Sequence, residues 1–225
     1  MPREGYQEKL DALREDVLYM SEVVLERLRK GLEALEYKDE ALAWEVIEGD
    51  EEVNEMYLDL EQDCIDLLAL QQPVASDLRL IAASFKIITD LERVADLATN
   101  LGDYTLDAHR DLVPDVDVTE IGTTVVEMVE DAMTAYAEKS PEACLAIAET
   151  DDEVDDLCER ASATVVRDLI EREVDVTSED DVEAIMADVS RLLLTIRDLE
   201  RVGDHAVNIA ARTLYMVEND EQLIY

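Results

Sequence analysis

Two short segments of this chain repeat each other and carry acidic residues at a helical spacing. The residues from Asp90 to Asn100 read DLERVADLATN, and 108 positions later the residues from Asp198 to Asn208 read DLERVGDHAVN. Each copy places Glu, Asp and Asn four residues apart, so on an α-helix they share one stripe. Carboxylates on one stripe repel one another and lose hydration, so they need a cation, an arginine or a water-filled groove. A multivalent metal ion is the simplest of these answers.

Two acidic segments upstream of the repeated motifs complete a set of metal-ligand candidates. The segment DEEVN, which starts at Asp50, is matched 101 positions later by DDEVD, which starts at Asp151. Antiparallel packing could bring each segment opposite one acidic stripe, and oxygen ligands of this kind suit magnesium, manganese or iron. The candidates are Asp50, Asn54, Glu92 and Asp96 in the first half and Asp151, Asp155, Glu200 and Asp204 in the second, with Asn100 and Asn208 as possible additions.

Solvated or salt-bridged surface is the competing interpretation of these acids. The chain has 58 acidic and 19 basic residues and a net charge of −39, so most carboxylates must be surface groups. Arg93 and Arg201 also lie next to the candidate ligands. The duplication favours the metal site, because the same pattern of Glu, Arg, Asp and Asn occurs in both halves. His205 points about 100° away from Asp204 on a helix and corresponds to Leu97, so we expect a packed histidine there.

Composition excludes several classes of protein. The acidic balance favours adaptation to a high-salt cytoplasm, because at molar ionic strength the Debye length is only about 3 Å. Direct nucleic-acid binding would need clustered Lys and Arg, which the sequence lacks. No stretch approaches a membrane span and no secretory signal is visible, so we expect a cytoplasmic protein with no membrane insertion. Cys64, Cys144 and Cys158 form no Cys-x-x-Cys pair and are expected to be small buried residues.

The groups that an enzyme would need are missing from this sequence. It has no glycine-rich phosphate loop, only two histidines, and no Ser or Cys nucleophile with a suitable base. A ferritin-like di-iron oxidase would need Glu-x-x-His on two helices, which neither repeated motif contains. We therefore expect a protein that is not an enzyme.

Regular apolar periodicity predicts an all-α fold of two tandem three-helix bundles related by a pseudo-twofold axis. Short connections between neighbouring long helices imply antiparallel packing. The expected helices run from Tyr6 to about Tyr37, from the N-cap Asp39 to about Gln71, from about Ala75 to Tyr104, from about Val118 to Glu138, from Ser140 and Pro141 to about Glu173, and from Ser178 to about Val217. Trp44 and Phe85 are expected to anchor the core.

The duplication divides the chain into a first repeat at 1–108, a linker at 109–117 and a second repeat at 118–217. The linker contains Pro114 and several Asp residues, which is typical of a connection between units. In the segment before the third helix, Arg79 is a candidate for holding a partner.

Four segments together resemble the PhoU family of phosphate transport accessory proteins. They are QPVASDLR at 72–79, DLERVAD at 90–96, DEEVN at 50–54 and DLERVGDHAVNI at 198–209. The resemblance covers both halves and implies six long helices in two bundles, with acidic motifs that bind metal ions, often iron or zinc, in surface clusters. It assigns Glu92, Asp96, Glu200 and Asp204, with Asp50, Asp151 and Asp155, to these clusters. Asn54 departs from an acidic ligand, so the first cluster could hold fewer ions, and Ala95 replaces the glycine found at Gly203.

The same resemblance implies a metal-binding regulatory adaptor. Members of the family negatively regulate the phosphate-starvation response and modulate the phosphate ABC transporter and, in bacteria, its sensor kinase. For this chain the resemblance implies the transporter ATPase subunit as partner, a sensor kinase or other regulator as a further partner, and a homodimer. The acidic, Lys-poor composition implies a halophilic archaeal source. The alternative is a structural or scaffold bundle whose acids form a halophilic surface without a specific metal site.

Overall fold

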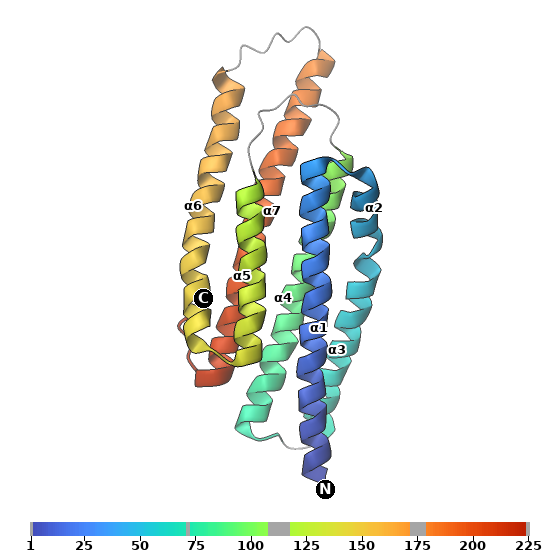
Figure 1. The fold of residues 1–225 in the computed structure, drawn as a ribbon, viewed down its shortest axis with the longest axis vertical. Coiled ribbons are helices and arrows are strands. Elements are labelled where there is room, and N and C mark those ends of the chain that lie inside the picture. Colours follow the sequence, from blue (N-terminus) through green and yellow to red (C-terminus); the bar gives the residue numbers. More distant parts are fainter. Residues whose placement is uncertain (1, 71–72, 108–117, 172–178, 224–225) are drawn as a thin grey trace.

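The chain folds into long α-helices whose axes are roughly aligned and whose chain directions mostly alternate (Figure 1). The computed structural model describes residues 2–70, 73–107, 118–171 and 179–223. The helices are α1 (Pro2–Tyr37), α2 (Glu40–Glu48), α3 (Asp50–Leu70), α4 (Ala75–Leu106), α5 (Thr119–Glu138), α6 (Pro141–Glu171) and α7 (Glu179–Glu218). The expected all-α class is confirmed. The expected linker at 109–117 and the expected helix limits at Gln71, Glu173 and Ser178 lie outside the described residues.

Helix boundaries follow from local capping chemistry. The Asp39 carboxylate accepts hydrogen bonds from the backbone amides of Ala41 and Leu42, at 3.0 and 3.1 Å, and so starts α2 as an N-cap. The Ser140 hydroxyl accepts from the amide of Ala143 at 3.3 Å at the start of α6. Both predicted N-caps are confirmed.

The second expected helix is interrupted at Gly49, where a single helix had been expected from Asp39 to about Gln71. Gly49 keeps right-handed helical angles (φ −74°, ψ −5°), so α2 and α3 continue in the same general direction. In an unbroken helix the carbonyl of Val46 would accept from the amide of residue 50. Here it accepts from Nη2 of Arg27 at 2.7 Å. The side chain of a residue in α1 therefore stabilises the interruption.

Two up-down-up bundles lie side by side (Figure 1). The first consists of α1, the α2 and α3 pair, and α4, and the second consists of α5, α6 and α7. The two bundles meet where α4 packs antiparallel to α7 and α1 packs against α5. The buried apolar side chains of both bundles form one connected core. The two helices that carry the repeated motifs, α4 and α7, thus pack against each other where the bundles meet.

Core composition matches most of the sequence expectations. Cys64, Cys144 and Cys158 are free and buried, as expected. Phe85 is partly buried and packs against the core. The expectation for Trp44 is wrong, because its side chain is 53% exposed while its neighbour Ala43 is fully buried. Helical geometry turns adjacent side chains about 100° apart, so only one of these two can face α4.

A buried carboxylate joins the two bundles. Asp198 of α7 has a fully buried side chain and accepts hydrogen bonds from the Tyr104 hydroxyl at 2.7 Å and from Nδ2 of Asn100 at 3.0 Å, both on α4. A second polar contact joins the same two helices, where Nδ1 of His205 in α7 lies 2.9 Å from Oδ1 of Asp90 in α4. Burial and the hydrogen bond to Asp198 raise the pKa of Tyr104 to about 12, so this phenol stays a donor.

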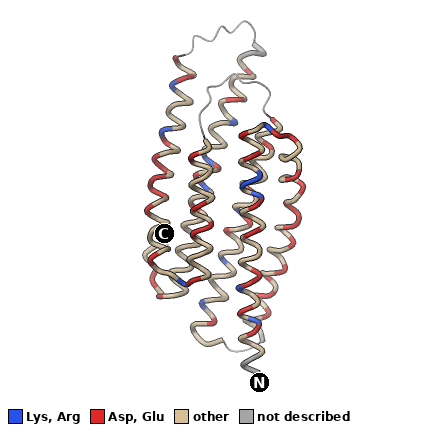
Figure 2. The backbone as a smooth tube through the Cα atoms, in the orientation of Figure 1, with Lys and Arg blue, Asp and Glu red and all other residues tan. Residues whose placement is uncertain are grey.

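Acidic residues are spread along the helices of both bundles, with few basic residues between them (Figure 2). This distribution agrees with a solvated acidic surface rather than with one localised acidic patch. Among the described helices, none has a stretch apolar enough and long enough to cross a membrane.

We expect the Tyr104→Phe substitution to lower the free energy of unfolding by about 1–2 kcal/mol, because it removes a donor from a buried carboxylate. Urea unfolding in high salt measures this loss. Tyr19→Phe is the matched control, since Tyr19 is 58% exposed. That control should change stability by less than about 0.5 kcal/mol. Equal stability of the two variants would show that Asp198 does not depend on the Tyr104 hydroxyl.

Candidate functional site

Four predicted ligands of the second half face one another across α6 and α7. Asp151 and Asp155 come from α6, and Glu200 and Asp204 come from α7. We call these four residues the second acidic cluster. Burial, together with the charges of Asp155 and Asp204, raises the pKa of Asp151 to about 6. Burial and neighbouring acids also raise the pKa of Asp155 and of Glu200. The predicted set is therefore brought within electrostatic reach.

One buried carboxylate oxygen in this cluster has no hydrogen-bond donor among the described residues. Oδ1 of Asp151 is buried and receives no hydrogen bond from any described residue. It lies against Gly203 of α7, where an added Cβ would be only 2.9 Å away. The missing side chain at Gly203 thus allows the carboxylate to approach the α7 backbone. A buried carboxylate oxygen without a donor is costly, so these residues fit a bound cation.

The side chains of the second acidic cluster do not converge on one point. Among the described residues, no three His, Cys, Asp or Glu side chains are arranged so that they could hold an ion as they stand. This agrees with the pKa shifts, because charge repulsion acts over several ångströms whereas coordination needs about 2.0–2.6 Å. Asp155 and Asp204 are exposed. Their side chains are free to rotate toward an ion on a fast timescale.

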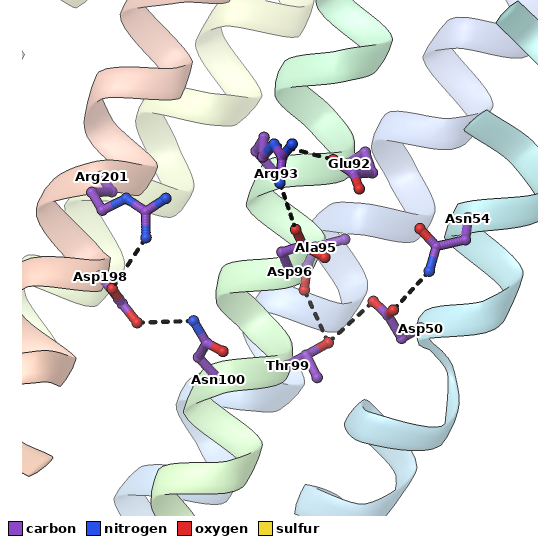
Figure 3. A network of polar contacts seen from close by, with 10 residues as sticks. All are labelled: Asp50, Asn54, Glu92, Arg93, Ala95, Asp96, Thr99, Asn100, Asp198 and Arg201. Atoms are coloured by element: carbon purple, nitrogen blue, oxygen red, sulfur yellow. Dashed lines mark hydrogen bonds and ion pairs between the residues drawn. The ribbon is translucent and has the colours of Figure 1, made fainter. Parts of the chain in front are cut away.

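The first half places its predicted ligands in a different environment (Figure 3). Asp50 and Asn54 on α3 lie opposite Glu92 and Asp96 on α4, and we call these four residues the first acidic cluster. Oδ2 of Asp50 accepts from Nδ2 of Asn54 at 2.8 Å, and Oδ1 accepts from the Thr99 hydroxyl at 3.2 Å. Asp50 therefore has partners within the chain at both oxygens.

Arg93 contacts the remaining two acids of the first acidic cluster. Nη1 of Arg93 lies 3.2 Å from Asp96, and its Nε lies 3.5 Å from Glu92. Burial and the charge of Asp96 raise the pKa of Glu92, while Arg93 opposes that rise. The corresponding Arg201 of the second half contacts Asp198 instead, at 3.5 Å. The two clusters share a spacing but differ in their partners.

The additional predicted residues lie away from both clusters. Asn100 donates to Asp198 at the interface between the bundles, and Asn208 is exposed. Nε of Arg79 donates to the carbonyl of Met216 at 3.2 Å. That carbonyl is in the last turn of α7, where backbone acceptors lack helical donors. The role of Arg79 in partner binding stays a prediction, and the structure gives this side chain a contact within the chain.

The acidic stripes follow the outer edge of each bundle. Leu78 and Met186, which lie on the same stripes nearer the starts of α4 and α7, are 46% and 56% exposed. Glu92, Asp96 and Glu200 are partly buried and Asp204 is exposed, so solvent and ions can reach these acids.

Comparison with known proteins agrees with this architecture. The model of the PhoU domain matches residues 17–105 and 118–213. The chain belongs to the PhoU family. It is 30% identical over 222 residues to the phosphate-specific transport system accessory protein PhoU homolog of Clostridium acetobutylicum, covering 96% of each chain. It is 32% identical over 219 residues to PhoU homolog 1 of Methanothermobacter thermautotrophicus, covering 96% of this chain and 95% of that one.

Solved PhoU structures share the fold. The crystal structure of PhoU from Pseudomonas aeruginosa superposes with a TM-score of 0.82 at 32% identity, covering 96% of this chain and 100% of that one. PhoU from Streptococcus pneumoniae gives a TM-score of 0.84 at 24% identity, covering 96% and 98%, and supports the fold alone.

Three residues of this PhoU chain that join its helices near the clusters were not among the predicted site residues. Asp90 and Asp198 open the two repeated motifs, so the repeat itself carried a signal for them. Arg27 carries no repeat signal, because the second half has Met128 at the position 101 residues later. Its place among buried α1 residues, between Val24 and Leu28, was the only local sign.

We expect the Asp151→Asn variant to be more stable than the wild type in chelator at pH 7. A raised pKa means that the folded state binds the proton more tightly than the unfolded chain does. The ionised Asp151 therefore costs stability as the pH rises from about 4 to about 6, and the cost is constant above that range. After discounting for partial exposure, we expect a gain of about 1 kcal/mol at pH 7 and little gain at pH 4.

Urea unfolding at both pH values, in high salt with EDTA, measures this difference. Asp131→Asn on the exposed face of α5 is the matched control and should leave stability nearly unchanged at both pH values. If Asp151→Asn behaves like the control at pH 7, the carboxylate is not penalised by its surroundings.

Proposed function

We propose that this PhoU-family chain is an accessory protein of phosphate uptake and acts as a metal-binding regulatory adaptor. The observation that carries the proposal is the match to PhoU proteins over both halves of the chain, whose relatives are named phosphate-specific transport system accessory proteins. The meeting of Asp151, Asp155, Glu200 and Asp204 at one surface supports the metal component. An accessory role requires no catalytic group.

The second acidic cluster is the proposed metal site. Asp151 and Glu200 would supply the inner oxygens, and the exposed Asp155 and Asp204 would rotate in to complete the set. Oxygen ligands of this kind suit iron, manganese or magnesium, and zinc also accepts carboxylates. Iron or zinc is the expectation from the family resemblance. Four acids at one edge attract a cation strongly, and bound charge would link α6 to α7.

Regulation would follow from this link between helices. An ion between α6 and α7 removes negative charge from one edge of the second bundle and fixes the side chains there. The altered surface would be presented to the ATPase subunit of the phosphate ABC transporter, on the cytoplasmic side of the membrane, and would restrain uptake when phosphate is plentiful. A sensor kinase or other regulator as a further partner, and a homodimer, remain predictions from the resemblance.

A scaffold bundle without a metal site is the alternative function. The observation that favours it is that the carboxylates of the described residues do not converge on one point. Metal content separates the two hypotheses, because a scaffold gains nothing from a bound ion.

We expect the Asp155→Ala, Asp204→Ala double variant to lose bound metal and to raise phosphate uptake in phosphate-replete cells of the native host. Both side chains are exposed and lie among like charges, so their removal should not unfold the bundle. Elemental analysis of protein purified in high salt without chelator measures the metal. Uptake of radiolabelled phosphate by a deletion strain carrying each variant measures regulation.

A second double variant, Glu127→Ala, Asp131→Ala, is the matched control. It removes the same number of exposed carboxylates from α5 and should keep wild-type metal content and uptake. Unchanged metal content and unchanged phosphate uptake in the Asp155→Ala, Asp204→Ala variant would contradict the adaptor proposal and favour the scaffold. Metal loss with unchanged uptake would keep the site but reject its regulatory role.

A further inference from the structure

The two acidic clusters can be compared position by position. Lys38 follows α1 and Lys139 follows α5 with nearly equal left-handed angles (φ 54° and 56°), so the first two helices of each half correspond at an offset of 101 residues. At that offset Arg27 corresponds to Met128, and Gly49 corresponds to Thr150. The motif helices correspond at an offset of 108, which pairs Thr99 with Val207 and Ala95 with Gly203.

Arg27 of α1 reaches the first acidic cluster from inside the bundle. The residue is only 6% exposed, and its Nη2 lies 2.7 Å from the Val46 carbonyl, 3.2 Å from the Thr99 hydroxyl and 3.5 Å from Oδ1 of Asp50. A side chain at Gly49 would collide with Nη1 of Arg27. The interruption at Gly49 and the buried guanidinium therefore belong to one arrangement, in which the helix backbone makes room for the cation.

The second acidic cluster lacks every one of these features. Met128 is buried beside the cluster and would lie 3.7 Å from a Cβ at Gly203, so an apolar thioether stands where the guanidinium would be. Val207 has no hydroxyl to donate, Asp155 replaces the amide of Asn54, and α6 continues unbroken through Thr150. Both oxygens of Asp50 have donors, whereas Oδ1 of Asp151, the corresponding residue, is left without one among the described residues.

The charges of the two clusters differ accordingly. The first has three acids, Asp50, Glu92 and Asp96, with Arg27 and Arg93 in contact. The second has four acids, and its neighbouring Arg201 contacts Asp198 instead. A buried arginine is stable only when its charge is paired, and a buried carboxylate has the same need. In the first cluster Arg27 and Asp50 pair at 3.5 Å, although Nε of Arg27 has no hydrogen-bond partner among the described residues. An added multivalent cation would therefore meet a guanidinium already in place.

We propose that Arg27 is a built-in cation that closes the first acidic cluster to metal, so that this chain binds metal through its second half alone. The inference rests on the metal component of the proposed function and assigns it to one half. The first bundle then holds its helices together without metal, and only the second bundle responds to metal supply.

Full-length variants of the first acidic cluster test the inference directly. We expect Glu92→Gln, Asp96→Asn to keep the wild-type metal content, while Asp155→Ala, Asp204→Ala loses it. We expect Arg27→Met, which copies Met128, to bind additional Mn²⁺ in a titration followed by electron paramagnetic resonance. Adding Glu92→Gln and Asp96→Asn to Arg27→Met should remove that gain. Metal loss in the Glu92→Gln, Asp96→Asn protein would overturn the inference while leaving the proposed metal adaptor intact.

Stability without metal provides a second readout that needs no metal binding by the wild type. In EDTA and high salt, Arg27→Met should lower the urea midpoint, because it leaves Asp50 without its buried cation. Adding Asp50→Asn should return the urea midpoint most of the way to the wild-type value. Adding Mn²⁺ should raise the midpoint of Arg27→Met but should not change the midpoint of Arg27→Met, Asp50→Asn. If Asp50→Asn restores nothing and Mn²⁺ has no effect, Arg27 is a packing residue and the inference fails. A metal-free wild type with metal gained by Arg27→Met would sustain the closing role of Arg27 but overturn the assignment of metal to the second half.

Discussion

A carboxylate packed against the side of a helix bundle loses water and must obtain a donor or a cation. This constraint organises the polar structure of the whole chain. Asp198 is fully buried and obtains donors from Tyr104 and Asn100 across the interface between the bundles. Asp50 obtains them from Thr99, Asn54 and Arg27. Asp151 is the one predicted ligand with a buried oxygen that no described residue satisfies.

The duplication preserves the helical framework more closely than the chemistry that the framework carries. Both halves place two oxygen-bearing side chains, Asp50 with Asn54 or Asp151 with Asp155, opposite an acidic stripe on the helix that carries the repeated motif, and both end their first helix at a left-handed lysine. A few side chains around those acids then decide the outcome. The residue at the matching position, Ala95 on α4 or Gly203 on α7, sets how closely the opposing carboxylate approaches the helix backbone, as the contact between Gly203 and Asp151 shows. Equal backbones can therefore hold unequal sites.

The net charge of −39 gives these buried contacts a special weight. In molar salt the Debye length is about 3 Å, so exposed pairs such as Arg93 with Asp96 are strongly screened. Buried groups are screened much less, and among the described residues these include Asp198, the pair of Arg27 with Asp50, and the unpaired Asp151 oxygen. Most acids of this chain are therefore solvated, and a small number of them are buried in surroundings less polar than water.

Sequence alone determined the helices, their antiparallel order and the membership of the second acidic cluster. Apolar periodicity and the caps at Asp39 and Ser140 are local properties, and a repeated motif at fixed spacing reports shared faces of a helix. Only the tertiary structure decided that Trp44 faces solvent, that the second helix breaks at Gly49, and that Arg27 reaches Asp50. Those outcomes depend on which face of α1 meets α3 and α4, because burial and pairing of a side chain arise from contacts between segments far apart in the chain.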